Sequence, residues 1–495
     1  MVTTSASSMP TTGHRIPSPR DLFRHAPTGG TNWALAGIAI AIAIGAIATL
    51  GTTALILLAI VIIAPLVVML WGATMTDVLI ASVFLEAVSF GGLTLSRLLA
   101  PVALLVVVVA LIRGRLSFHP GPLIVPVAAY TLWAIASGIW SVSLPHTMEI
   151  LGSLGIALVY MVSFATLIHD ERDMRRTFTV LAAASMLIGL VSIASFAGTP
   201  ILATESLQGG RSQGGVGDPN FFANVQLVAL PIILLMAAEA KSLMARIFFG
   251  FATIVAITSV FSTLSRGALI ALVVVALILP FIPAQWLMGS QRQKKALLLI
   301  LALAVGGLFT RPAFRSEVVS RVQTLFASQG ADAAGGGSSA GSGRTELWKA
   351  AFTTIEERPL IGLGLGAFPS QSNQLLFRSP GVKLDLIATH PDGIEAHSAY
   401  IGTAADLGFV GLGALLGIIL TIFASLARLA ARARRAGAVF CGRVATALTL
   451  SMVGWVISSA FIETETARPL WIVIGLTFVL GKIVARAESE RGRPG

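Results

Sequence analysis

Long apolar stretches, separated by short polar connections, run through most of this chain. Each stretch is continuous rather than alternating, and each is close to the ~20 apolar residues that a helix needs to cross a bilayer core. The pattern therefore predicts an all-α polytopic membrane protein, a bundle of 12–14 transmembrane helices. The predicted segments fall near residues 33–50, 52–71, 77–92, 97–112, 121–140, 149–168, 178–197, 221–239, 247–264, 267–283, 295–310, 398–427, 444–462 and 469–486.

The stretch 77–92 differs from the others. It carries Asp77 and Glu86 and ends in Phe90-Gly91-Gly92. Charged residues are costly within a bilayer core and glycines break helices, so we expect a short or re-entrant helix here.

Composition supports a lipid environment. Only 12% of the residues are charged and 55% are hydrophobic, whereas a soluble chain is about 25% charged. Transmembrane barrels give short alternating segments, which this chain lacks. The single cysteine, Cys441, cannot form an intramolecular disulfide and is interpreted as a small apolar filler.

The positive charges indicate the topology. With the N-terminus inside, every predicted inner connection is basic, and both ends of the chain are cytoplasmic. Residues 1–32 and 487–495 are then polar cytoplasmic tails, the first of them disordered. Because most cations are explained by topology, the net charge of +11 does not indicate nucleic acid as a partner.

The stretch 311–396 is far longer than an ordinary connection and is predicted to be a large, partly helical extracytoplasmic loop. It separates the N-terminal part of the helix bundle, 33–310, from the C-terminal transmembrane helices, 397–486. A helix is predicted over Arg311–Ser328, and a Gly/Ser-rich tract follows at 329–343. A second helix begins near Arg344 and stops at Pro359. The glycine run at 362–366 follows no β-strand, so a tight packing turn is favoured over a nucleotide loop.

Two arginines on the predicted outer side need an explanation. Arg266 lies in a tight turn between two apolar spans, and Arg211 lies in a loop shaped by glycine and proline. An arginine near bilayer depth either faces a functional interior or extends to the lipid headgroups. The Ser and Gly beside Arg266 favour the interior, whereas Arg211 remains balanced between the two. Asn220 is interpreted as the N-cap of the helix that starts at Phe221.

His397 lies where the long loop returns to the membrane, at the start of a helix. A histidine there is more often structural, but its ordinary pKa also suits a general base. Several outer arginines with one histidine favour an anionic ligand such as phosphate. Asp385, Asp392 and Glu395 are scattered, so neither a metal site nor another cofactor is expected.

Four stretches in this order resemble the O-antigen ligase and O-antigen polymerase family of bacterial envelope glycan enzymes. They are Arg211–Asn220, Ser265–Ala268, Gly343–Gly364 and His397–Gly408. The family often has Asn where this chain has Ser398 and Glu where it has Asp406.

The resemblance implies a metal-independent glycosyltransferase in the bacterial cytoplasmic membrane, with its active site on the extracytoplasmic side. The donor would be a glycan on undecaprenyl pyrophosphate, and the acceptor a hydroxyl on a glycan, lipid or protein. His397, Arg266 and Arg344 would match the catalytic residues. Arg211, Asn220 and Tyr400, which lie in the matching stretches, would bind substrate.

Two other functions remain open. A secondary transporter of an anion or small solute would also have many spans, although no internal repeat is evident. A non-catalytic scaffold leaves Arg266 and His397 without a role. The sequence does not separate ligase from polymerase, and it identifies neither the sugar, the acceptor nor the oligomeric state.

Overall fold

The computed structural model describes residues 75–90, 93–112, 121–199, 211–288, 290–292, 295, 342–378 and 393–491, without the side chains of Phe90, residues 342–345 and Arg378. Every described residue belongs to one compact unit, Ile63–Gly495. Several predictions lie outside the described residues: the tail 1–32, the spans 33–50 and 52–71, all of the span 295–310 except residue 295, and the loop residues 311–341 and 379–392.

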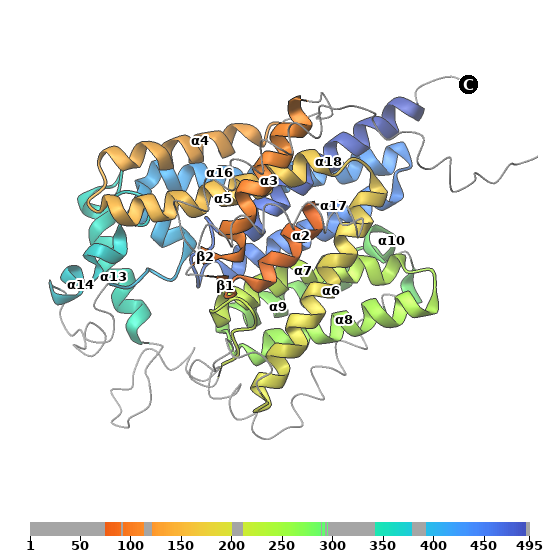
Figure 1. The fold of residues 1–495 in the computed structure, drawn as a ribbon, viewed down its shortest axis with the longest axis horizontal. Helices are drawn as coiled ribbons and strands as arrows, with labels where there is room; N and C mark the ends of the chain where they lie inside the picture. Colours follow the sequence, from red (N-terminus) through yellow and green to blue (C-terminus); the bar gives the residue numbers. More distant parts are fainter. Residues whose placement is uncertain are drawn as a thin grey trace, which may run out of the picture. The chain divides into compact units, whose positions relative to one another are not determined.

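Helices make up nearly all of the described structure (Figure 1). Eight of them are long and apolar enough to cross a membrane: α3 (Leu95–Ile112), α5 (Leu144–Leu167), α6 (Glu171–Phe196), α7 (Pro219–Glu239), α8 (Leu243–Ser262), α16 (Ala399–Ala436), α17 (Val439–Ser458) and α18 (Arg468–Arg491). The chain is therefore an all-α, multi-pass membrane protein, as its apolar pattern predicts.

Shorter elements complete the described unit. Three apolar helices each continue into a 3-10 turn: α2 (Met75–Ser82) with η2 (Val83–Leu85), α4 (Ile124–Ala136) with η3 (Ser137–Ile139), and α9 (Arg266–Ile278) with η4 (Leu279–Phe281). The others are α10 (Ala284–Leu287), α13 (Ser342–Glu357), α14 (Phe368–Arg378) and a minimal antiparallel pair, β1 (Ser89–Phe90) and β2 (Leu93–Thr94). Since three predicted spans lie outside the described residues, the total of 12–14 stays a prediction.

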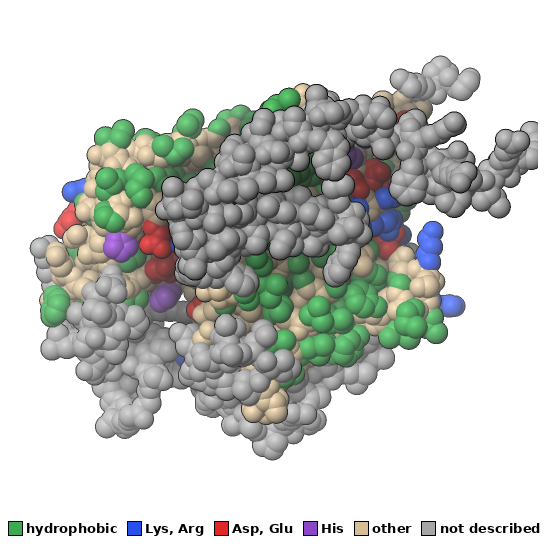
Figure 2. All heavy atoms as spheres, viewed as in Figure 1, with side chains coloured by type: hydrophobic (Ala, Val, Ile, Leu, Met, Phe, Trp, Pro, Cys, Tyr) green, Lys and Arg blue, Asp and Glu red, His purple; other side chains and the backbone are tan. Residues whose placement is uncertain are grey.

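The helices α7, α17 and α18 form the most buried part of the unit. The buried share of their apolar windows is 83%, 67% and 78%, against 39% in α3. Trp455 of α17 and Trp471 of α18 are completely buried. The peripheral helices instead expose large apolar side chains such as Ile112 and Phe281, and Figure 2 shows apolar patches over the surface. In a bilayer this surface faces acyl chains and needs no polar cover.

Ion pairs and hydrogen bonds join the basic connections at one end of the bundle. The Glu239 carboxylate, at the end of α7, pairs with Arg443 of α17 and lies 2.9 Å from Arg175 of α6. Arg486 of α18 donates to the His169 carbonyl between α5 and α6, at 3.3 Å. Figure 2 shows Lys and Arg side chains gathered at the end where α10 and the last turns of α18 lie. These connections are the ones that the positive-charge pattern places together on one side.

The stretch 77–92, predicted to be short or re-entrant, contains a short helix that reaches between two polar clusters. At its start, the Asp77 carboxylate lies 2.9 Å from the guanidinium of Arg176. Beyond η2, the Glu86 carboxylate lies 2.8 Å from Arg468, the first residue of α18. The β1–β2 pair then reverses the chain into α3. The acidic residues are thus neutralised by arginines from neighbouring helices rather than left alone in an apolar segment.

Candidate functional site

Arg266 is the first residue of α9 and follows a tight, buried turn. Leu264 adopts a left-handed backbone conformation, with φ of 50°, and Ser265 is the extended N-cap residue. The Thr263 hydroxyl accepts the Ser265 N–H at 3.2 Å. Residues 261–265 and 267–268 are all buried, whereas Arg266 is only half-buried. A strained non-glycine backbone held by its surroundings is common at functional sites, and here it directs a cation out of a packed turn.

Arg211 supports this turn from the loop before α7. Its Nε donates to the Thr263 carbonyl at 2.9 Å, and one terminal nitrogen donates to Asn220 Oδ1 at 2.7 Å. The Arg211 guanidinium therefore joins the turn that carries Arg266 to the first turn of α7. The sequence left two interpretations of Arg211 open. These contacts favour a side chain that lies inside the bundle over one that extends to the lipid headgroups.

Asn220 does not cap α7, contrary to the sequence interpretation. The N-cap is Asp218, whose carboxylate accepts the Phe221 N–H at 2.8 Å, and Pro219 occupies the first helical position. Proline suits that position because its missing N–H would have no helical partner. Asn220 lies one residue further along, and its side-chain oxygen is used by Arg211 instead.

A chain of hydroxyl groups holds the Arg211 loop against the bundle. Ser192 of α6 donates to the Ser212 hydroxyl at 2.7 Å and lies 2.8 Å from the Ser262 hydroxyl. The Ser212 N–H also donates to the Ser262 carbonyl at 3.2 Å. All three serines are buried. Buried hydroxyls that satisfy one another fix the register of α6, α8 and this loop.

His397 immediately precedes α16 rather than opening it. Ser398 is the N-cap, and its hydroxyl accepts the Ile401 N–H at 3.4 Å. His397 itself is left-handed, with φ of 52°, and is half-buried. Leu264 and His397 are the two described non-glycine residues with positive φ, and each stands just before the N-cap residue of a helix. One strained position is therefore His397 itself, and the other lies two residues before Arg266.

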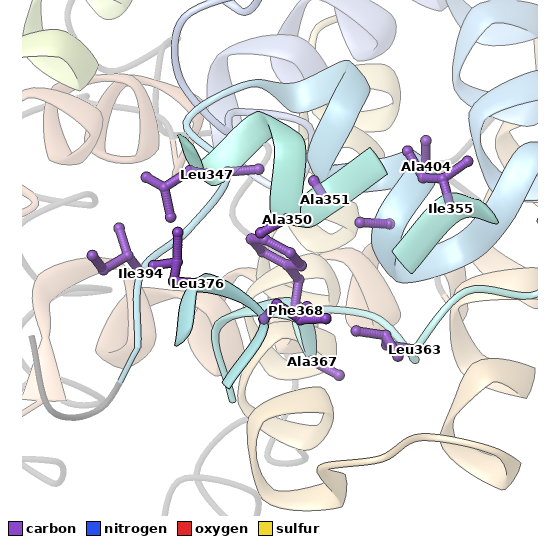
Figure 3. Close-up of a cluster of buried hydrophobic side chains, with 13 residues drawn as sticks. Leu347, Ala350, Ala351, Ile355, Leu363, Ala367, Phe368, Leu376, Ile394 and Ala404 are labelled. Atoms are coloured by element: carbon purple, nitrogen blue, oxygen red, sulfur yellow. The ribbon is translucent and has the colours of Figure 1, made fainter. Parts of the chain in front are cut away.

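The outer helices hold the segment that leads into His397. Trp348 of α13 donates its indole N–H to the Ala396 carbonyl at 2.9 Å. The Ser372 hydroxyl of α14 accepts the Ile394 N–H at 2.8 Å. A small apolar core joins these elements to α16, and Figure 3 shows Phe368 within it beside Ala350. The second half of the long loop is thus a packed support for His397.

Both turns meet one connection, the turn Ser459–Ile462 between α17 and α18. The Ala399 N–H, two residues after His397, donates to the Ser459 carbonyl at 2.9 Å and to the Ile462 carbonyl at 3.1 Å. Gly267, the neighbour of Arg266, packs so closely on Phe461 that a β-carbon there would lie 2.6 Å from its ring. Gly267 and Ala399, which are far apart in the sequence, therefore contact the same four-residue turn.

The remaining sequence candidates lie at different places. Tyr400 donates its hydroxyl to the Val456 carbonyl of α17 at 2.7 Å, which anchors the first turn of α16. Arg344 lies in α13, four residues before Trp348, and its side chain lies outside the described residues.

The glycine run at 362–366 is a packing turn, as the sequence indicates. The Asp406 carboxylate accepts the N–H groups of Gly366 at 2.7 Å and Phe368 at 2.8 Å. A β-carbon at Gly362 would lie 2.4 Å from the Asp406 backbone. At Gly408, where φ is 66° and ψ −171°, the helical path of α16 is interrupted beside this turn. Asp406 therefore organises the loop backbone.

Carboxylates gather near the site, although the sequence scatters them. Although part of the Glu395 side chain is exposed, the surrounding protein desolvates its carboxylate and, with Asp218, raises its pKa. Desolvation, followed by the charges of Glu395 and Glu465, raises the pKa of Glu463 well above its ordinary value. Burial raises the pKa of Glu465 to about 8, against the opposing effect of backbone hydrogen bonds.

Sequence reasoning missed Glu463 and Glu465. The signal that could have found them is the pair of carboxylates in the short connection before Arg468, between two strongly apolar spans. In the part of the chain that the structure describes, no group of three or more His, Cys, Asp or Glu side chains is arranged to hold a metal ion.

Residues 251–416 match the family model described as O-antigen ligase. This match supports assignment to the O-antigen ligase and polymerase family. The matched range includes Arg266, α13, the glycine-rich turn, His397 and Tyr400. Arg211 and Asn220 precede it, and the turn Ser459–Ile462 follows it. No curated protein matches the chain.

The O-antigen ligase match supports three coarse conclusions about the chain. It indicates a glycan-transfer function, a glycosyltransferase type of enzyme, and a membrane setting in which a lipid carries the glycan donor and a glycan is the acceptor. Together with the eight apolar helices, it supports a multi-pass membrane protein of polysaccharide biosynthesis. Neither the match nor the described contacts support the transporter alternative.

Proposed function

We propose that this protein transfers a glycan from undecaprenyl pyrophosphate to an acceptor hydroxyl at the extracytoplasmic face of the bacterial cytoplasmic membrane. The observation that carries the proposal is the approach of the Arg266 and His397 turns to the single turn Ser459–Ile462. This arrangement offers a cation and a titratable base at one place. Glycan transfer from a pyrophosphate needs both, because the leaving group gains negative charge while the acceptor loses a proton.

His397 acts as the general base. It accepts the proton of the acceptor hydroxyl while the oxygen attacks the anomeric carbon and the bond to pyrophosphate breaks. A single displacement of this kind inverts the anomeric centre. The backbone at His397 is left-handed, with φ of 52°, and the Ala399 N–H donates hydrogen bonds to the turn Ser459–Ile462. Both features fix the position from which the imidazole acts. Fixed geometry of this kind lowers the entropic part of the barrier.

Arg266 and Arg344 stabilise the departing pyrophosphate. Guanidinium groups match phosphate oxygens with two hydrogen bonds and keep their charge at any physiological pH. Arg266 is supported by Arg211, which binds the Thr263 carbonyl within the same turn. In this proposal Arg211 and Asn220 hold the donor side of the site, and Tyr400 lies on the acceptor side of His397. The cations replace the divalent metal that soluble glycosyltransferases often use.

The buried glutamates are compatible with an anionic donor because they are neutral when protonated. With a pKa of about 8, Glu465 keeps its proton at neutral pH, and burial raises the pKa of Glu463 well above its ordinary value too. A protonated carboxyl does not repel pyrophosphate, and it can donate a hydrogen bond. The charge near the turn Ser459–Ile462 is then set by the arginines.

A direct test uses the purified full-length protein in liposomes, with a polyprenyl-pyrophosphate-linked glycan and a candidate acceptor. We expect glycan transfer with release of polyprenyl pyrophosphate, and the same rate after chelation with EDTA. A transfer that stops on chelation would contradict the metal-independent mechanism. Movement of solute across the liposome membrane, without cleavage of the donor, would instead support a transporter. An acceptor that is another copy of the repeating glycan identifies a polymerase, and a different lipid acceptor identifies a ligase.

A further inference from the structure

A second candidate binding site lies near the basic end of the bundle, away from the turn Ser459–Ile462. A cavity of about 180 Å³ opens between the start of α4, the last third of α16 and the middle of α18. Because α16 runs from Ala399 beside His397 to Ala436, its last turns are far along the helix from the proposed active site. The proposed glycan transfer does not use this cavity.

Ser425 places an unpaired hydroxyl on the cavity wall. Ser425 is 8% exposed, and its hydroxyl has no hydrogen-bond partner among the residues that the structure describes. A buried hydroxyl without a partner lowers stability because it has lost its hydrogen bonds to water. A ligand that fills the cavity and forms a hydrogen bond to this oxygen would remove that cost.

Two arginines share the same face of α16 with Ser425. Arg428 and Arg432 follow it by three and seven residues, which places all three on one side of the helix, and all three line the cavity. Arg428 uses its Nε on the Ala424 carbonyl at 3.1 Å, a bond that leaves its terminal nitrogens available. Arg432 binds Glu488 through two bonds of 3.0 and 2.6 Å, so Arg428 contributes most of the uncompensated positive charge.

The opposite wall adds a helix N-terminus. Gly121, Pro122 and Leu123 lead into α4 and line the cavity. The Ile124 and Val125 N–H groups already donate to the Gly121 and Pro122 carbonyls, at 3.0 and 3.3 Å, so this end contributes the positive end of the helix dipole rather than free donors. The positive end of a helix dipole, a guanidinium and an unpaired hydroxyl together favour an anion. Phosphate oxygens can accept hydrogen bonds from the guanidinium and the hydroxyl.

The rest of the cavity wall is apolar except for Thr477, whose hydroxyl donates to the Val473 carbonyl of its own helix at 2.8 Å. Leu123, Leu429 and Phe478 line it, and Gly481 leaves space beside Leu429. A free inorganic anion gains nothing from such a surface, whereas the glycerol and first acyl carbons of a lipid bury apolar area against it. Basic pockets between transmembrane helices are known to bind lipid headgroups.

We propose that this cavity binds a phosphate ester, with its phosphate oxygens held by Arg428 and Ser425 and facing the positive end of α4. The combination of polar donors and apolar wall favours the headgroup of an anionic phospholipid as the source of the phosphate. Such a lipid stabilises the packing of α4 against α16 and α18.

The test titrates the purified full-length protein in detergent with dioctanoyl phosphatidylglycerol and measures binding by calorimetry. Dioctanoyl glycerol, which has the same chains and no phosphate, and inorganic phosphate are titrated in parallel. We expect phosphatidylglycerol to bind and dioctanoyl glycerol not to bind. Arg428→Gln should weaken binding at least about tenfold, because it removes a charged hydrogen-bond donor. Ser425→Ala should weaken it several-fold without loss of stability, since that hydroxyl has no protein partner to lose.

Arg172→Gln is the matched control. Arg172 is an exposed arginine at the start of α6 and does not line the cavity. The Arg172→Gln variant should bind phosphatidylglycerol as tightly as the wild type does. If inorganic phosphate binds as tightly as phosphatidylglycerol and is weakened equally by Arg428→Gln, the cavity is a phosphate site whose ligand is a soluble phosphate rather than a lipid. Equal binding of both lipids, or unchanged binding by Arg428→Gln and Ser425→Ala, would overturn the proposal.

Discussion

Gly267 lies against Phe461 so closely that a β-carbon at position 267 would come within 2.6 Å of the Phe461 ring. This contact connects the first turn of α9, which carries Arg266, to the connection that also holds the start of α16. The absence of a side chain at position 267 is therefore a requirement for packing the first turn of α9 against the turn Ser459–Ile462.

Gly267→Ala should displace α9 from Phe461. We expect a loss of about 1–3 kcal/mol of stability, as is usual for an added methyl group in a packed site, together with lower glycan transfer. Thermal unfolding in detergent measures the first effect. Gly250→Ala in α8, where a β-carbon meets nothing within 4 Å, is the control and should be neutral or slightly stabilising. Adding Phe461→Ala to Gly267→Ala should make room for the new methyl group and recover part of the lost stability and glycan transfer. If the double variant recovers neither, the contact between Gly267 and Phe461 is not the cause of the losses.

Trp348→Phe should impair the positioning of His397. The substitution removes the indole N–H that binds the Ala396 carbonyl and keeps most of the apolar packing. We expect a several-fold lower kcat with a shifted pH profile, because the position of the imidazole changes. Trp140→Phe is the matched control, since its indole N–H also donates to a carbonyl, that of Ile361, at 2.9 Å. Equal losses in both variants would indicate a general structural effect instead.

Asp218→Ala and Asn220→Ala should have different consequences. Loss of the Asp218 cap should lower stability by about 0.5–2 kcal/mol. Loss of Asn220 removes a partner of Arg211 rather than a cap, so we expect a smaller change in unfolding temperature and a higher KM for the donor. A larger loss of stability in Asn220→Ala would return the capping role to Asn220.

Glu465 should make the protein less stable as pH rises. Its pKa is about 8 in the folded protein against an ordinary 4.5, so between these values the folded state keeps a proton that the unfolded chain releases. The free energy of unfolding therefore falls as pH rises through this window. Glu465→Gln should reduce this dependence in thermal unfolding measured from about pH 5 to about pH 9. Glu149→Gln, at an exposed carboxylate, should leave it unchanged; the same pH dependence in Glu465→Gln would contradict the assignment.

The apolar pattern was sufficient to predict an all-α membrane protein, because each spanning helix must satisfy its own backbone in lipid. The charge pattern grouped the basic connections that Glu239 and its arginine partners bring together. The pattern could not resolve helix termini. Asn220 and Asp218 both have side chains that can cap a helix, and the choice depends on Arg211, which the tertiary fold brings to Asn220.

The site was predictable only in part, for a similar reason. Arg266 attracts attention because it is a cation in a tight turn between two apolar spans, and His397 because it lies where the long loop returns to the membrane. Their common neighbour, the turn Ser459–Ile462, carries no such signal, since its role depends on backbone carbonyls and one aromatic ring. The gathering of Glu395, Glu463 and Glu465 likewise depends on tertiary packing that spacing in the sequence does not reveal.

The central claim, that His397 and Arg266 act together in glycan transfer, is tested most directly by a double-mutant cycle. Transfer rates would be measured in liposomes for His397→Ala, Arg266→Ala and the double variant, at equal amounts of folded protein. We expect each single change to lower the rate by about 10²–10⁴-fold, and the double variant to be little slower than the worse single one. Arg97→Ala, which removes an exposed arginine paired with Glu149, should retain activity. Near-normal transfer by His397→Ala and Arg266→Ala would contradict the account.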